Sequence, residues 1–163
     1  MKTIKYILAV FISVVFSVSA LSQTSYNFND GLTAAKSANK KILISIYIDG
    51  DSWCEKMQSV YSGESIKNYI NNNFIFIKLN GQGSEKYNYN GKQYSASDLS
   101  KLFGATGYPT HVFLGSDGSI LKFKYNGEVL NCYSGYVDAA EFDKILKFFA
   151  GNQYKDTDLS KIL

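Results

Sequence analysis

A β-favouring run, Ile42-Leu43-Ile44-Ser45-Ile46-Tyr47-Ile48, leads directly into a helical segment that begins near Ser52. The run is nearly all apolar, which is typical of a strand buried in the centre of a sheet. Phe74-Ile75-Phe76-Ile77-Lys78-Leu79 is a second run of the same kind, and an interrupted helical segment separates the two. This order predicts an α/β domain in which helices cover a central sheet in three layers.

The rest of the chain supplies further elements of such a domain. Apolar spacing and capping residues predict several helices, over residues 31–39 (capped by Asn29 or Asp30), 52–61, 66–71, 99–103, 139–149 and a short one capped at Thr157. Asn90-Gly91 between alternating tyrosines predicts an inserted β-hairpin at residues 87–94, and Ser95 to Asp98 resembles a capping box. Residues 111–114 and 120–123 are expected to form another hairpin, and a turn at Asn126-Gly127 then leads to residues 128–133.

The N-terminus predicts a secretory signal peptide. Two lysines lie within the first five residues, an apolar stretch runs from Tyr6 to Val18, and small residues follow it. This is the pattern of an export signal, and the stretch is shorter than the ~20 residues needed to cross a bilayer. We expect cleavage after Ser22 or after Ala20. Residues 1–22 would then be removed, and residues 23–163 would form one exported, periplasmic domain with no stable membrane insertion.

The charge of the mature domain argues against a nucleic-acid partner. Without Lys2 and Lys5, the 17 basic residues fall to 15, against 14 acidic ones. Every basic residue is a lysine, so the chain lacks the planar arginine fork that usually makes bidentate contacts with phosphate and guanine. With no basic excess either, we expect no binding to nucleic acid.

Cys54 and Cys132 are the two cysteines of the chain. Export would place them where disulfides persist, and their spacing is too wide for a short metal motif. Three arrangements stay open: two free thiols, one long-range disulfide, or one buried and one exposed thiol. A disulfide would close a loop long enough to contribute ~4 kcal/mol of stability.

Four segments together resemble the exported bacterial thioredoxin-like family. The segment from Asp51 to Met57 (Asp-Ser-Trp-Cys-Glu-Lys-Met) resembles the family's Cys-x-x-Cys-Lys-x-Met, and Gly107-Tyr108-Pro109-Thr110 resembles its cis-proline turn. Asp117-Gly118 and Gly135-Tyr136 also match. The resemblance covers residues ~28–150. It implies a thioredoxin-like three-layer α/β/α sandwich with a central mixed β-sheet and an inserted β-hairpin, thiol–disulfide exchange as the family's activity, and no cofactor.

The chain departs from the family at the residues that perform this exchange. Asp51 stands at the place of the attacking cysteine, and a carboxylate cannot attack a disulfide. Cys54 matches the shielded, resolving cysteine, and an ionised Asp51 nearby would raise its pKa. The family's buried acid corresponds to Ser45. The resemblance therefore predicts a degenerate active site with weak or no disulfide reductase activity.

The same resemblance implies which residues would still act. Cys54 is the candidate single thiol, with Asp51 beside it and Cys132 as a candidate resolving thiol. Trp53, Tyr108 and Pro109 are the candidate substrate-binding residues, because family members hold an extended protein or peptide along the main chain before the cis-proline. This peptide-binding edge could outlive the redox activity.

Each candidate also has a purely structural interpretation. Asp51 is a good helix N-cap, worth ~1 kcal/mol without any chemistry, and Cys54 can serve as a small buried hydrophobe. Trp53 either forms a contact surface or is buried against the hairpin. His111, the only histidine, could approach and activate Cys54, although we favour a hydrogen-bonded core residue.

No metal site is expected, because Asp49 and Asp51 lack the further oxygen ligands that a calcium loop requires. Three functions stay open on the sequence: a thioredoxin-like redox protein that works through one thiol, a catalytically silent peptide- or protein-binding module, and a structural accessory domain that makes contact through an exposed hairpin at residues 87–94.

Overall fold

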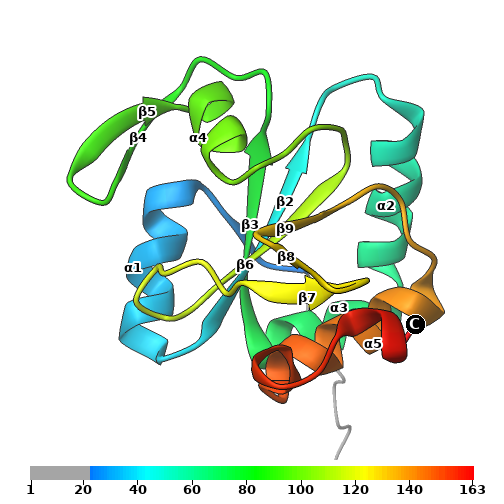
Figure 1. Ribbon diagram of the computed structural model, residues 1–163. Coiled ribbons are helices and arrows are strands. Elements are labelled where there is room, and N and C mark those ends of the chain that lie inside the picture. Colours follow the sequence, from blue (N-terminus) through cyan, green and yellow to red (C-terminus); the bar gives the residue numbers. More distant parts are fainter. Residues whose placement is uncertain (1–22) are drawn as a thin grey trace, which may run out of the picture.

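The computed structural model describes residues 23–163, in which a five-stranded mixed sheet lies between two layers of helices (Figure 1). Its strands follow the order β1-β3-β2-β6-β9. Their bounds are Ser25–Tyr26 (β1), Lys41–Tyr47 (β2), Phe74–Asn80 (β3), Thr110–Leu114 (β6) and Cys132–Ser134 (β9). β1, β3 and β2 are parallel to one another, β6 runs antiparallel to β2, and β9 runs antiparallel to β6. The predicted three-layer sandwich with a mixed sheet is confirmed.

The helices divide between the two faces of the sheet. One face carries α1 (Phe28–Ala38) and α4 (Ala96–Leu102), and the other carries α2 (Ser52–Ser62), α3 (Glu64–Asn73) and α5 (Ala139–Ala150). Among the described residues, no helix is both long and apolar enough to span a bilayer. The predicted signal peptide at residues 1–22 lies outside the described residues.

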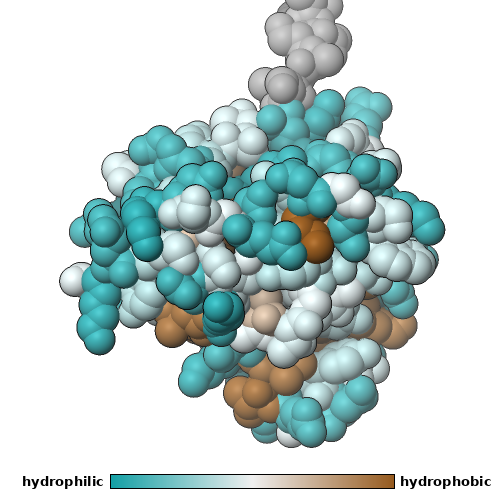
Figure 2. Space-filling model, turned by 90° about the horizontal axis from the view of Figure 1, so that it is seen from above, coloured by the Kyte–Doolittle hydropathy of each residue, from teal (hydrophilic) through white to brown (hydrophobic). Residues whose placement is uncertain are grey.

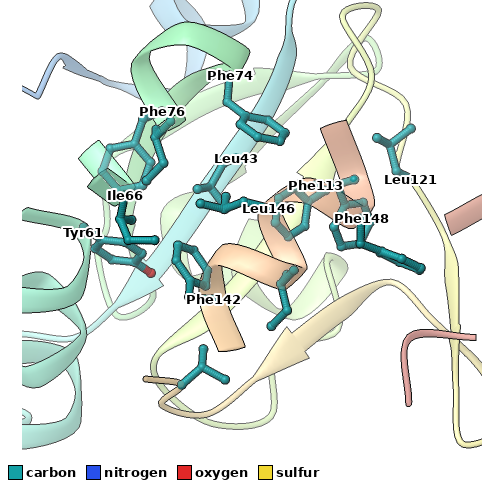
Figure 3. Packing of buried hydrophobic residues seen from close by; sticks show 14 of the residues in the cluster. Leu43, Tyr61, Ile66, Phe74, Phe76, Phe113, Leu121, Phe142, Leu146 and Phe148 are labelled. Carbon is teal, nitrogen blue, oxygen red and sulfur yellow. The ribbon is translucent and has the colours of Figure 1, made fainter. Parts of the chain in front are cut away.

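The nearly continuous apolar character of β2 follows from burial on both faces of the sheet. Leu43 packs into the core beneath α2, α3 and α5, whereas Ile42, Ile44 and Ile46 pack into the core beneath α1 and α4. Aromatic rings dominate the first core, which contains Phe113 stacked on Phe149 with ring centroids 3.7 Å apart. Figure 3 shows this cluster with Tyr61 near one edge.

The inserted hairpin forms as the Asn90-Gly91 signal predicts, from β4 (Lys86–Tyr89) and β5 (Lys92–Ser95). Both turn residues have positive φ, which asparagine and glycine tolerate best. The expectation of an exposed tyrosine-rich hairpin is wrong for Tyr89, which is buried against Phe28 and donates a hydrogen bond to the Gly118 carbonyl. The hairpin therefore covers part of the core on the α1 side of the sheet.

The expected hairpin of residues 111–114 and 120–123 is largely wrong. A single bridge joins Leu114 to Ile120, after which the chain leaves the sheet as β7 (Phe123–Tyr125) and pairs with β8 (Glu128–Leu130). The tight turn at Asn126-Gly127 determines this pairing, and the edge position beside β6 goes to β9 instead. Apolar spacing predicted these strands but not their partners.

The bounds of α1, α3 and the C-terminal tail differ from the predictions. α1 begins at Phe28 because Asn27, and not Asn29 or Asp30, caps it. α3 extends from Glu64 to Asn73, beyond the expected residues 66–71. The tail forms two short 3₁₀ helices, η1 (Gln153–Lys155) and η2 (Leu159–Lys161), and the cap of η2 is Asp158, one residue after the predicted Thr157.

Candidate functional site

The candidate site lies where β2 ends and α2 begins. Figure 2 shows the end of the molecule that carries this junction. Most of that face is hydrophilic or of intermediate hydropathy, with small separate hydrophobic patches. Asp51 caps α2: its Oδ1 accepts a hydrogen bond from the Cys54 main-chain N–H at 2.8 Å. The N-terminus of a helix favours a negative charge. This bond is the principal cause that lowers the pKa of the Asp51 carboxyl, so Asp51 is ionised at neutral pH.

Cys54 is a shielded thiol. Only 8 % of its surface is exposed. Burial is the main cause that raises the pKa of Cys54 to about 11, and the neighbouring Asp51 raises it further. Because the thiolate is the nucleophile in disulfide exchange, a pKa of about 11 leaves about one thiol in 10⁴ ionised at pH 7. The site thus holds a permanent carboxylate in front of a protonated thiol.

The structure does not bring Cys132 to Cys54. Both cysteines are free. Of the three arrangements that the sequence left open, the long-range disulfide is therefore not formed. Cys132 lies opposite Val112 in the β6–β9 pairing, packs with the α1 and α4 side of the sheet, and donates a hydrogen bond from its Sγ to the Gly104 carbonyl. Cys54 lies on α2, which covers the opposite face. The sheet therefore separates the candidate single thiol from the candidate resolving thiol.

His111 is a core residue in the structure. It is fully buried, its Nδ1 lies 3.2 Å from the Tyr133 carbonyl oxygen, and its ring packs on Tyr61 and Phe142. Burial lowers the pKa of the imidazole to about 4, so the ring is neutral. No hydrogen bond joins His111 to Cys54, and Tyr61, which the sequence analysis did not single out, is the residue that lies next to both the histidine and the thiol.

The Tyr108–Pro109 peptide bond is cis, as the resemblance implied. The Tyr108 side chain is directed inwards, and its hydroxyl donates a hydrogen bond to the Gly81 carbonyl at 3.2 Å. Within residues 23–163, the main-chain N–H and C=O of Tyr108 have no hydrogen-bond partner. Any contact that Tyr108 makes with a bound chain would therefore involve its main chain and not its ring.

Trp53 is half exposed, so the interpretation that it is buried against the hairpin is wrong. Its ring lies 5.6 Å from that of Tyr136, which is 39 % exposed, and the Lys56 ammonium lies 4.1 Å above the indole. We call Trp53, Lys56 and Tyr136 the aromatic patch. The sequence analysis missed Lys56 and Tyr136 as site residues, although Gly135-Tyr136 was among the segments that matched the family.

The comparisons agree with this geometry. A family model described as a thioredoxin-like domain matches residues 28–150. The chain belongs to the thioredoxin-like domain family. Among solved structures, it is similar to a thioredoxin-fold protein from Helicobacter pylori, with 20 % identity, a TM-score of 0.63, and coverage of 86 % of this chain and 84 % of that one.

Two further structures are similar at the level of the fold. A thioredoxin from Thermus thermophilus is 18 % identical with a TM-score of 0.57, over 79 % of this chain and 88 % of that one. A putative disulphide-isomerase from Bacteroides thetaiotaomicron is 21 % identical with a TM-score of 0.56, over 78 % and 91 %. A search of curated proteins found no match. These likenesses establish the thioredoxin fold.

A metal centre finds no support in the described part of the chain, where no group of three or more histidine, cysteine, aspartate or glutamate side chains could hold an ion. Asp49 accepts a hydrogen bond from the Asn80 amide at 2.8 Å, and Asp51 accepts one from the main chain of α2. The two carboxylates therefore have structural partners of their own.

A pair of substitutions at Asp51 separates its charge from its role as a cap. Asp51→Asn keeps a good capping side chain but removes the charge, whereas Asp51→Ala removes both. We expect Asp51→Asn to lower the pKa of Cys54 and to speed its alkylation, with little loss of stability. Asp51→Ala should have the same effect on the thiol and cost about 1 kcal/mol of unfolding free energy. The measurements are alkylation rate against pH and urea unfolding. Equal stability of the two variants would show that Asp51 is not needed as a cap.

Proposed function

We propose that this thioredoxin-like domain is an exported, catalytically silent module that binds extended polypeptide through the aromatic patch and the main chain of Tyr108, next to the cis-Pro109. The observation that carries the proposal is the Asp51–Cys54 pair: a capping carboxylate occupies the position of the attacking thiol, and the remaining thiol is buried and protonated. The single-thiol redox alternative needs an accessible thiolate, which burial and Asp51 both oppose.

The surface beside Asp51 and Cys54 has two features that are typical of a binding site. Exposed tryptophan and tyrosine side chains are enriched at binding hot spots, because they offer a large rigid contact area with a polar end. An unpaired main-chain N–H and C=O at Tyr108 can form hydrogen bonds with an extended chain, as an added strand does. Such contacts recognise the main chain of a partner and need no thiol.

The test is binding of an unfolded, reduced and carboxymethylated polypeptide, which contains no disulfide or free thiol, measured by titration calorimetry or fluorescence. Truncating Trp53 to alanine should weaken binding about tenfold, since an aromatic hot spot contributes at least ~1.4 kcal/mol. Tyr136→Ala should weaken it in the same direction. Cys54→Ser should leave the dissociation constant unchanged.

The matched control is Leu102→Ala, which truncates an exposed hydrophobic residue on α4, on the opposite side of the sheet from α2. It should bind like the unmodified chain. Loss of binding in Cys54→Ser, with full binding in Trp53→Ala, would reject the silent module and favour single-thiol chemistry.

A further inference from the structure

A cavity of about 190 Å³ lies beside Cys54 and opens next to Pro109. It is lined by residues from the end of β2, from α2 and from β3: Ser45, Tyr47, Ile48, Asp49, Gly50, Cys54, Glu55, Gln58, Tyr61, Lys78 and Pro109. Since a water molecule accounts for about 30 Å³ of liquid, the cavity has the volume of about six waters. That is room for a small side chain or an equally small free molecule.

Tyr61, one of the lining residues, has a buried polar group. Tyr61 is 1 % exposed, and its hydroxyl has no partner with regular hydrogen-bond geometry. Burial raises the pKa of this hydroxyl well above its ordinary value, while the Ser45 hydroxyl acts in the opposite direction and Cys54 adds to the rise. The hydroxyl is therefore neutral and close to both side chains. A buried hydroxyl without a partner is costly, so a ligand that offers it an acceptor gains the corresponding free energy.

The charged side chains that line the cavity are of both signs, so an ion of either sign meets a like charge as well as an opposite one. Asp49 and Glu55 bring two carboxylates, which repel an anionic ligand, and Lys78 brings an ammonium, which repels a cationic one. Lys78 lies 5.2 Å from the centroid of the Tyr47 ring, and no ion pair neutralises it within the described part of the chain. The lining favours a neutral ligand with an acceptor for the Tyr61 hydroxyl and donors for the carboxylates.

We infer that this cavity binds a neutral carboxamide, whose oxygen accepts from the Tyr61 hydroxyl and whose NH₂ group donates toward Asp49 or Glu55. A primary amide is the common side-chain group that combines these functions without charge. The source of the carboxamide rests on the proposed function. It is the side chain of an asparagine or glutamine in the bound polypeptide, because Pro109 lines the cavity and also lies at the binding surface.

The first experiment uses free probes of equal size on the mature chain: propionamide, propionate and propylammonium. NMR shifts of the main-chain amides of Ser45, Cys54 and Tyr61 report occupancy. Propionamide should give saturable shifts, and the two ions should bind at least about fivefold more weakly. Tyr61→Phe keeps the ring that packs on Phe76 and Phe142 and should weaken propionamide binding about fivefold, the effect of one lost hydrogen bond.

Tyr154→Phe, which removes a hydroxyl that is not part of the cavity lining, is the matched control and should bind propionamide normally. The inference is overturned if propionamide gives no saturable shifts, if propionate or propylammonium binds equally well, or if Tyr61→Phe retains full affinity. A folded-state spectrum of each variant ensures that a lost signal does not come from unfolding.

A second experiment separates this inference from the proposed function. Three otherwise identical extended peptides carry glutamine, glutamate or leucine at one position, and their binding is measured with the unmodified chain and with Trp53→Ala. Preference for glutamine that disappears in Tyr61→Phe supports the side-chain assignment, and equal binding of all three overturns it. Propionamide binding without any peptide binding would reject the proposed function while leaving the amide site intact.

Discussion

Replacing Asp51 with cysteine is expected to convert this chain into an active disulfide reductase. The new thiol would lie at the N-cap of α2, where the helix dipole and free N–H groups stabilise a thiolate. Family thiols in such a position have a pKa of ~7, so about half would be ionised at pH 7, against about one in 10⁴ for Cys54. The substitution also removes the charge that raises the pKa of Cys54. We expect reductase activity to rise by about three orders of magnitude.

Reduction of insulin by dithiothreitol-recycled protein measures this change, with intact mass to detect a disulfide between residues 51 and 54. Asp51→Ser is the control, since it also removes the charge but supplies no thiol. It should remain inactive. An inactive Asp51→Cys variant that still folds would show that Asp51 is not the decisive replacement. The absence of a buried acid at Ser45 would then become the leading cause, and adding Ser45→Asp would test it.

The second large expected effect is a dependence of the unfolding free energy on pH, and it arises from His111. Its folded pKa of about 4 lies below the ordinary value of 6.5. Between these values the unfolded chain binds a proton that the folded chain excludes, so the unfolding free energy falls as the pH falls. The stability that His111 contributes as a neutral group is fully present above pH 6.5. It is lost progressively down to pH 4, by a total of about 3 kcal/mol.

Urea unfolding at several pH values between 4 and 7.5 measures this loss. His111→Phe keeps an aromatic ring against Tyr61 and Phe142 but cannot titrate, and the carboxylates shared by both proteins cancel in the comparison. We expect the variant to lose markedly less stability on acidification than the unmodified chain. Identical pH dependence in the two proteins would mean that His111 is hydrated or protonated in the folded state.

The sequence was sufficient to predict those elements that depend on local chemistry. The apolar runs gave β2 and β3, Asn90-Gly91 gave the β4–β5 hairpin, and Asp51 was identified as the cap of α2. Each of these is decided by residues close together in the chain. The thioredoxin-like fold was implied by the resemblance of four short segments to the family, and the observed order of elements agrees with it.

What the sequence did not predict depends on contacts between distant residues. β9 lies beside residues 110–112 of β6, and β7 pairs with β8, because these segments meet in the folded chain and not because of a local signal. Tyr61 has the ordinary spacing of a core residue on α2, and only the packed structure brings its hydroxyl beside Ser45 and Cys54. Tyr136 meets Trp53 only because the loop after β9 passes the start of α2.

The separation of the two cysteines likewise required the structure. The positions 54 and 132 allow a disulfide by loop length alone, and the sequence analysis left it open. Cys132 lies on the face of β9 that packs toward α1 and α4, and this orientation follows from its pairing with Val112. A register shifted by one residue would have turned the thiol to the face that α2 covers, since strand side chains alternate.

The most direct test of catalytic silence is the mass of the folded domain, residues 23–163, after incubation with oxidised glutathione, measured without reduction. A protonated, shielded Cys54 and a distant Cys132 predict no glutathione adduct on Cys54 and no loss of two protons from a Cys54–Cys132 bridge. Full alkylation of both thiols after unfolding would confirm that they were free. A stable adduct on Cys54, or a bridge between the two cysteines, would contradict the account.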